Sequence, residues 1–260
     1  MYTATDLWHH MQEMGLTSRD TVLIHTSMSA VGPVEGGADG LLDAFCGYLS
    51  DGLFLVPTHT WLSVNPEHPV YDVRSSQPCI GIVPSRAAVR SEGFRSLHPT
   101  HSIWGYGKNA ASFLAGEEHA ASPCPPGFCW DRLADIHAKI LLIGVGHNRN
   151  TFLHSVDERA GLTDRLGEPF SVTIRDQAGQ CHCGMIRGHR CSRVEDVAEY
   201  YVNFEKPFLR AGIQTFGMLG NAQVRILDAA AARELVLRVY AQADDDILLR
   251  HQDLPEAFYR

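Results

Sequence analysis

Short apolar runs alternate along this chain with amphipathic helical segments, and this alternation constrains the fold more than any other feature. The clearest run is "ILLIGV" at residues 140–145, which breaks at Gly146 and leads into a helical segment that starts at Thr151. Strands that read as unbroken apolar runs are buried on both faces, so helices must cover both faces of their sheet. The sequence therefore predicts one α/β domain over residues 1–260, with three layers and a central, mainly parallel (mixed) sheet.

The remaining elements follow from the same patterns. Strands are predicted at residues 21–24, 53–56, 140–145 and 224–227, and a small late hairpin at residues 170–174 and 181–186. Helices are predicted at residues 5–16, 37–49, 82–90, 108–114, 131–135, 151–160, 194–211 and 229–241, with Thr3 or Thr5 capping the first. Residues 57–77 lack periodicity and are predicted to form an active-site loop.

Composition and charge exclude several classes of protein. No apolar run approaches the ~18 residues that span a bilayer, and the N-terminal "MYTATDLWHHMQEMGL" is typical of an amphipathic helix rather than a signal peptide. The net charge is −8 without a basic stripe, which argues against nucleic-acid binding. We therefore expect a cytoplasmic protein without nucleic-acid or membrane partners, whose seven cysteines are reduced thiols or metal ligands.

The first candidate site is the polar loop after the predicted strand at residues 21–24. In "VLIHTSMSAVG" the chain passes His25, Thr26 and Ser27 on its way into a helix. Ligands of open α/β sheets bind beyond the carboxyl ends of the strands, and a helix N-terminus offers N–H groups to phosphate. The same small polar residues can equally cap and turn the chain, because the stretch is neither a P-loop nor a dinucleotide fingerprint.

The second candidate is the segment "RSLHPTHSIWGYGK". Pro99 forces an extended approach after His98, and Ser102 follows in the same loop. Loops on a rigid scaffold often carry function, but on this stretch alone a surface turn is the favoured interpretation.

The third candidate is His154, in the first turn of a helix that Thr151 is predicted to cap. Asp157 and Glu158 follow at i+3 and i+4, so both share a helical face with the histidine. A neighbouring carboxylate raises the basicity of an imidazole and fixes its orientation, which suits a general base. The alternative is a partly exposed capping histidine with solvated acids.

A cluster of thiols and imidazoles lies in "CHCGMIRGHRC". Zinc needs about four nitrogen or sulfur ligands, and this stretch offers Cys181, Cys183, His189 and Cys191. However, a C-x-C pair on a strand points both thiols to one face, and zinc knuckles usually space their cysteines as C-x-x-C. We therefore assign no metal ligand and favour a catalytic or structural role for His189. Cys124 and Cys129 are expected to be loop residues.

Together these stretches resemble the aminoglycoside 3-N-acetyltransferase family of acetyl-CoA-dependent enzymes. The matching stretches, in family order, are "DTVLIHTSMSAVGPVEGG", "RSLHPTHSIWGYGK", "SPCPPGFCWDRL", "ILLIGVGHNRNTFLHSVDERA" and "GMLGNAQVRILDA". The resemblance covers nearly the whole chain. It implies a single α/β N-acetyltransferase domain with a deep cleft, acetyl-CoA as co-substrate and a small-molecule amine as acceptor, and it leaves a homodimer open.

The resemblance also assigns residues by position. His154 corresponds to the family's catalytic base and Asp157 to the acidic residue three positions later. The coenzyme site would comprise His25, Thr26, Ser27, Val31, Gly32, His98, Pro99 and Ser102. Because no G-x-S-x-G elbow is present, we expect direct attack of the amine on acetyl-CoA, with backbone N–H groups near Ser27 stabilising the oxyanion.

One departure from the family concerns the acceptor. Members that modify aminoglycosides typically carry a carboxylate in a W-x-T-x-E/D stretch after the hairpin, and here His189 lies near that place. We therefore expect acetylation of an aminoglycoside-like or natural-product amine, with weak activity on common aminoglycosides. The alternative is a coenzyme A- or zinc-binding protein of the same fold without catalytic activity.

Overall fold

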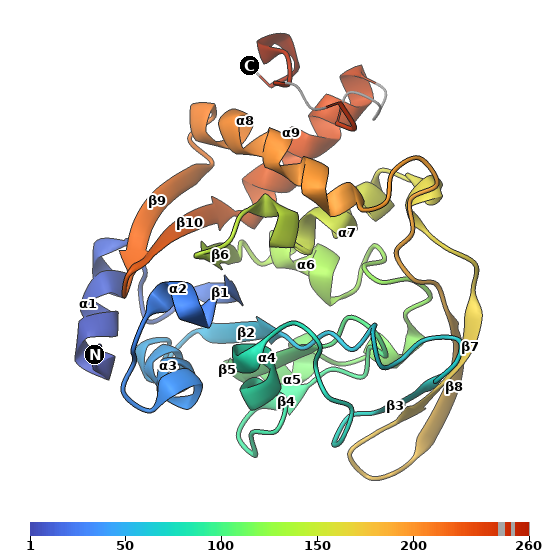
Figure 1. Cartoon of the computed structure of the whole chain (residues 1–260), viewed down its shortest axis with the longest axis horizontal. Helices are drawn as coiled ribbons and strands as arrows, with labels where there is room; N and C mark the ends of the chain where they lie inside the picture. The colour runs from blue at the N-terminus through green and yellow to red at the C-terminus, as the bar shows by residue number, and fades with distance from the viewer. Residues whose placement is uncertain (244–247, 251–252, 260) are drawn as a thin grey trace.

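The computed structural model describes residues 1–243, 248–250 and 253–259. It contains a seven-stranded central sheet, a separate three-stranded sheet and helices on both faces of the central sheet, which confirms the predicted α/β fold class (Figure 1). The strands are β1 (Thr21–Thr26), β2 (Leu53–Pro57), β3 (Val70–Asp72), β4 (Phe94–Arg95), β5 (Ile103–Gly107), β6 (Lys139–Ile143), β7 (Phe170–Arg175), β8 (Cys181–Ile186), β9 (Gln214–Leu219) and β10 (Ala222–Asp228).

The helices account for most of the predicted helical segments. The α-helices are α1 (Ala4–Glu13), α2 (Met28–Val31), α3 (Gly37–Tyr48), α4 (Ile82–Ala87), α5 (Ala110–Phe113), α6 (Cys129–Asp135), α7 (Phe152–Arg159), α8 (Glu205–Arg210) and α9 (Ala229–Gln242). Short 3₁₀ helices are η1 (Glu117–His119), η2 (His147–Arg149), η3 (Thr163–Arg165), η4 (Val197–Phe204) and η6 (Glu256–Phe258). Among these helices none is long and apolar enough to cross a membrane.

The central sheet has the strand order β4-β5-β2-β1-β6-β10-β9. The three middle strands β2, β1 and β6 are parallel, whereas β5 and β4 on one side and β10 and β9 on the other pair antiparallel. The sheet is therefore mixed, with a parallel centre whose three carboxyl ends meet at one edge. This edge is the place where open α/β sheets bind their ligands.

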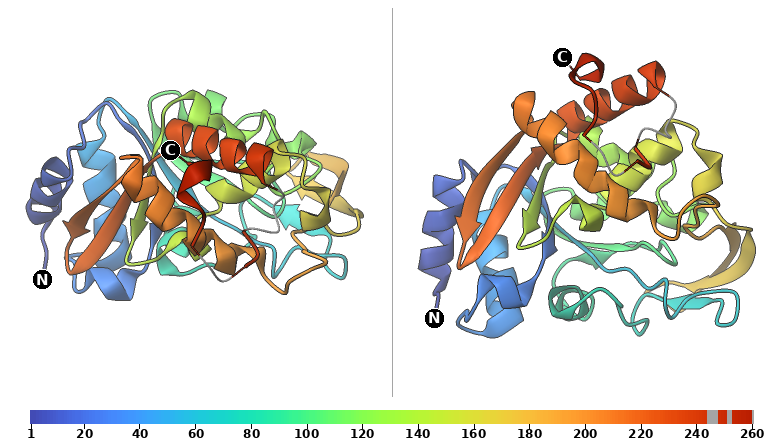
Figure 2. Two further views of the ribbon diagram at one scale, coloured as in Figure 1. Left: turned by 90° about the horizontal axis from the view of Figure 1, so that it is seen from above. Right: turned by 45° about the horizontal axis from the view of Figure 1, so that its top comes forward.

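Two apolar layers fill the space between the sheet and its helices. Helices α1, α3 and α4 cover one face, where Phe45 of α3 stacks on Phe54 of β2 with ring centroids 4.8 Å apart. Helices α6, α7 and α9 cover the other (Figure 2). Trp130 is fully buried on that side. Each such side chain contributes about 1.5–3 kcal/mol by leaving water.

The late hairpin is confirmed as β7 and β8, and it stands apart from the central sheet in Figure 1. It forms a second sheet with β3, which pairs parallel to β7. The prediction of an irregular loop over residues 57–77 is wrong at β3. There Tyr71 is fully buried and its hydroxyl donates to the carbonyl of Ser96 at 2.9 Å, an anchor that a local pattern does not reveal.

Three other expectations differ from the structure. Residues 103–107 and 214–219 form strands β5 and β9, which were not predicted. β5 pairs with the distant β2, and β9 pairs with β10, the strand that was expected over residues 224–227. The helix expected over residues 194–211 is divided into η4 and α8. Thr151 is the N-cap residue of α7, as predicted, but its side chain makes no capping hydrogen bond. Thr3 does cap α1, with a reciprocal bond to Asp6.

Candidate active site

A cavity of about 730 Å³ opens at the carboxyl edge of the three parallel strands. Thr26 at the end of β1, Pro57 at the end of β2 and Val145 after β6 all line it. Strand β6 ends where Gly144 takes a φ of +66°, and a Cβ on Gly144 would come within 2.3 Å of the Cβ of Ala30. Glycine therefore lets the chain leave the sheet beside α2 and turn towards α7, whose first turn reaches the cavity.

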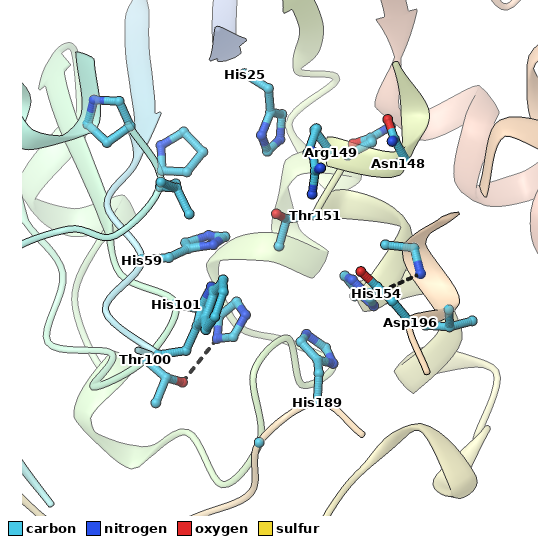
Figure 3. Close-up of a pocket in the computed structure, with 18 of the residues that line it drawn as sticks. His25, His59, Thr100, His101, Asn148, Arg149, Thr151, His154, His189 and Asp196 are labelled. Atoms are coloured by element: carbon cyan, nitrogen blue, oxygen red, sulfur yellow. Dashed lines mark hydrogen bonds between the residues drawn. The ribbon is translucent and has the colours of Figure 1, made fainter. Parts of the chain in front are cut away.

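His154 projects from α7 into this cavity (Figure 3). Its Nδ1 lies 2.8 Å from the hydroxyl of Tyr201. The same hydroxyl donates to Oδ2 of Asp157 at 2.7 Å. A phenol has one proton, so Tyr201 must accept the Nδ1–H of His154 while it donates to an ionised Asp157. Nε2 of His154 is then the unprotonated ring nitrogen, which is the atom a general base needs.

Asp157 is buried in a cage of donors rather than placed directly against the imidazole. Tyr201 and Tyr240 donate to its two oxygens, each at 2.7 Å, and Nε of Arg165 lies 3.4 Å from Oδ2. Burial raises the pKa of the Asp157 carboxyl to about 6, because the loss of water outweighs these donors and the Arg165 charge. The carboxylate thus acts on His154 through Tyr201.

The expected rise in the basicity of His154 is wrong. Removal from water lowers the pKa of His154 to about 3, and the positive charge of Arg165 acts in the same direction. The imidazole is consequently neutral at pH 7 and can accept a proton. Glu158, the second predicted neighbour, turns away from His154: its oxygens accept hydrogen bonds from the hydroxyl of Ser122 and the N–H of Cys124.

Imidazoles line much of the cavity (Figure 3). His189 stacks on His154 with ring centroids 3.9 Å apart, and it meets His101 edge-on at 4.8 Å. His101 in turn lies 4.5 Å from His59. Burial and mutual repulsion hold the pKa values of His59, His101 and His189 well below the ordinary value, so these rings are neutral as well.

Charged groups lie nearer the mouth of the cavity. Arg149 and Arg190 line it together with Glu195 and Asp196, and all four residues are exposed. Asp196 also caps η4 by accepting the N–H of Ala198 at 2.9 Å. The mouth is thus balanced in charge, whereas the floor is built from neutral imidazoles.

The predicted coenzyme residues are divided by the structure into two groups. His25, Thr26 and Ser27 line the cavity, and the side-chain atoms His25 Nε2 and Thr26 Oγ1 are buried without a hydrogen-bond partner. Ser27 cannot use its own N–H for an oxyanion, since this group already donates to the carbonyl of Ile143 at 2.9 Å. Oxyanion stabilisation by that amide is therefore ruled out.

The other group lies behind the cavity wall and consists of Val31, Gly32, His98, Pro99 and Ser102. His98 accepts the N–H groups of Thr100 and His101 at Nδ1 and donates from Nε2 to the carbonyl of Ser122 at 2.9 Å. It holds the loop that presents His101. In the same way Ser102 donates to the carbonyl of Thr58 at 2.8 Å, inside the protein.

Several site residues were missed at the level of sequence. His101 lies in the quoted "HPTH" stretch and could have been found there, since it follows His98 by three residues. Tyr201, Tyr240 and Arg165 carry no local signal, because they reach Asp157 from separate parts of the chain. The two cysteines that were expected to be loop residues, Cys124 and Cys129, are fully buried, and the second of them begins α6.

Comparisons with known proteins agree on one family. The family model described as aminoglycoside 3-N-acetyltransferase matches residues 23–241. Aminoglycoside N(3)-acetyltransferase VIII from Streptomyces fradiae is 30% identical over 245 residues, which cover 85% of each chain. Aminoglycoside N(3)-acetyltransferase VII from Streptomyces paromomycinus is 29% identical over 186 residues, which cover 65% of this chain and 63% of that protein.

Solved structures share the fold over almost the full length. A mutant of aminoglycoside acetyltransferase AAC(3)-IVa in complex with a gentamicin aligns with a TM-score of 0.78 at 23% identity, covering 100% of this chain and 94% of that one. A binary complex of AAC-IIIb with CoASH aligns with a TM-score of 0.75 at 22% identity, covering 90% and 94% of the two chains.

Proposed function

This chain belongs to the aminoglycoside 3-N-acetyltransferase family, and on that premise we propose that it transfers the acetyl group of acetyl-CoA to an amine of an aminoglycoside-like small molecule. The observation that carries the proposal is the free Nε2 of His154 at the floor of a cavity beyond the parallel strands. Acetyl-CoA is the co-substrate that the family implies, and the CoASH complex of AAC-IIIb supports it. The sequence-based prediction of family membership is thereby confirmed.

The transfer needs a base and an acceptor amine whose nitrogen is placed to attack the thioester carbonyl of acetyl-CoA. The neutral amine attacks the thioester carbonyl, a C–N bond forms, and the C–S bond to coenzyme A breaks. Nε2 of His154 takes the proton that the attacking nitrogen loses, and this proton goes on to the departing thiolate. General-base assistance of this kind accounts for about 10²–10⁴-fold in rate, and positioning supplies much of the rest.

Asp157 and Tyr201 keep His154 in the required tautomer. When His154 gains a proton, the positive charge lies next to the Tyr201 hydroxyl, whose oxygen is made more negative by its bond to Asp157. This stabilisation exists only after proton transfer begins, so it lowers the barrier rather than the energy of the bound substrate. We assign Asp157 and Tyr201 positioning roles on this ground.

The coenzyme and the acceptor occupy opposite ends of the cavity in this proposal. His25, Thr26 and Ser27 contact the coenzyme at the end of β1, with Val31, Gly32, His98, Pro99 and Ser102 shaping the loops behind them. Gly32 takes a φ of +85°, which other residues rarely adopt, and a Cβ there would also meet the side-chain Nδ2 of Asn221 at 2.6 Å. His189 lines the acceptor end beside His154.

Substitution of Tyr201 with phenylalanine tests the positioning role. Because it removes one hydroxyl and keeps the ring, we expect the fold to persist while kcat falls about 10–100-fold, which corresponds to a charge-linked hydrogen bond of about 1.5–3 kcal/mol. KM for the amine should change little. Tyr240→Phe is the matched control: it removes a bond to the same carboxylate without touching His154, so its effect on kcat should be smaller. Equal losses in both variants would contradict the relay.

The proposed function is tested by a screen of amines with acetyl-CoA that follows release of the coenzyme thiol. We expect turnover with at least one amino sugar. Because neutral His189 replaces an anion beside His154, we expect kcat/KM for gentamicin and kanamycin to stay below the ~10⁴ M⁻¹s⁻¹ typical of proper substrates. Values above that limit would show the substrate inference to be wrong. Absence of both turnover and calorimetric binding of millimolar acetyl-CoA would remove the acetyltransferase proposal.

A further inference from the structure

A thiol, a carboxyl group and an imidazole meet at the floor of the cavity, which His189 lines. They belong to Cys124 before α6, Glu158 in α7 and His189 after β8, and one donor atom from each lies within 4.8 Å of the other two. In the part of the chain that the structure describes, this is the one grouping of three such residues at that separation. The three are also far apart in the sequence, so only the fold brings them together.

His189 has an unused capacity to bind a ligand. Both of its ring nitrogens are shielded from solvent, and neither has a hydrogen-bond partner. An orphaned buried polar group costs about 1–3 kcal/mol, so native proteins seldom leave one without a purpose. Stacking on His154 and the edge contact with His101 fix the plane of the ring but satisfy neither nitrogen.

Cys124 and Glu158 lack a positive partner. Glu158 accepts hydrogen bonds from Ser122 and the N–H of Cys124, but no ion pair joins it to a cation within residues 1–243, 248–250 and 253–259.

We propose that Cys124, Glu158 and His189 bind one divalent transition-metal ion, zinc by the chemistry of the donors. Sulfur, nitrogen and carboxylate oxygen are the ligands that zinc prefers, and three protein ligands leave a fourth position open. Zinc holds such donors at about 2.0–2.3 Å in a tetrahedron, which puts the donor atoms about 3.3–3.8 Å from one another. The three atoms, which lie within 4.8 Å of one another, must therefore move closer on binding. Gly188 precedes His189 and can provide that adjustment.

This site shares only His189 with the four candidate zinc ligands in the sequence stretch from Cys181 to Cys191. Cys181 and Cys183 are exposed on β8, and Cys191 lies 3.3 Å from Nη1 of Arg165. His189 instead turns inward, where it lines the cavity in front of the other two ligands. The open fourth position would face the acceptor end of the cavity, so a heteroatom of the acceptor could occupy it.

Metal binding is measured on the untagged full chain, stripped with a chelator and reloaded with zinc or with cobalt(II). We expect about one equivalent of zinc per chain and, with cobalt, an absorption band from thiolate-to-metal charge transfer. Cys124→Ser should abolish the band, and His189→Ala should weaken zinc binding at least about 100-fold, since even loss of an outer-shell contact costs 10–100-fold. Cys183→Ser is the matched control and should change neither.

The outcomes are distinguishable from failure of the proposed function because no acyl transfer is measured. The melting curve of Cys124→Ser shows whether this variant remains folded. If it unfolds, zinc binding by His189→Ala and Glu158→Gln still tests the site, because both substitutions lie at less buried positions. Loss of metal in Cys183→Ser together with retention in His189→Ala would overturn the proposal. So would the absence of zinc binding in the wild-type chain.

Discussion

Replacing His154 with alanine is expected to lower kcat by at least about 100-fold while acetyl-CoA still binds. His154 lines the cavity, and its Nε2 is free to accept a proton. Its Nδ1 is hydrogen-bonded to the hydroxyl of Tyr201, which in turn donates to Asp157. Among the residues that the structure describes, His154 is the histidine with this arrangement. Removing a general base costs about 10²–10⁴-fold. Because the coenzyme residues His25, Thr26 and Ser27 lie on another loop, the dissociation constant of acetyl-CoA should stay within a factor of a few.

The measurement combines steady-state kinetics on an accepted amine with calorimetric titration of acetyl-CoA. His119→Ala is the matched control, since that side chain is 77% exposed and remote from the cavity. If His154→Ala keeps a near-wild-type kcat, another group removes the proton. A variant that loses coenzyme binding along with kcat would instead place His154 in the coenzyme site.

Mild acid is expected to unfold the protein cooperatively between about pH 6 and pH 4. Burial lowers the pKa values of seven histidines below 6.5, which are His25, His59, His98, His101, His147, His154 and His189. Each gains a proton on unfolding in this range, so stability is lost as pH falls below the unfolded pKa. The stability that these buried neutral histidines contribute to the folded protein is fully present only above about pH 6.5.

Three carboxyl groups oppose this trend. Burial raises the pKa values of Glu117, Asp157 and Glu158, and it raises those of Asp157 and Glu158 to about 6 and about 7. Near pH 5 these last two carboxyls are protonated in the folded chain and largely ionised in the unfolded one, so each loses a proton on unfolding. Seven histidines gain a proton and these two carboxyls lose one, which leaves a net uptake of about five protons near pH 5.

A net uptake of five protons corresponds to about 7 kcal/mol per pH unit, because one proton per unit is worth about 1.36 kcal/mol. Against a typical stability of about 5–15 kcal/mol, about one to two pH units suffice for unfolding. Urea titrations from pH 7 to pH 5 measure the slope. His147→Gln should reduce it by about one proton, whereas His119→Gln should leave it unchanged. A stability that is flat from pH 7 to pH 5 would contradict the burial of these rings.

The fold class could be predicted from the sequence because its central strands are locally encoded. The run that became β6 is apolar on both faces, and the glycines after it and the helical period that follows are all visible in the sequence. The hairpin β7–β8 was predicted for the same reason. Strands β5 and β9 were not: β5 contains two glycines and is held by hydrogen bonds to the distant β2, and the middle of β9 is largely exposed.

The sequence by itself determined the positions of His154 and Asp157 on one turn of helix and the order of the loops around them. Only the tertiary structure decided what those residues touch. Tyr201 lies between His154 and Asp157, and the environment lowers the pKa of the histidine where a neighbouring carboxylate was expected to raise it. Burial, orphaned nitrogens and the meeting of Cys124 with His189 arise from packing between distant segments, and no local pattern specifies such contacts.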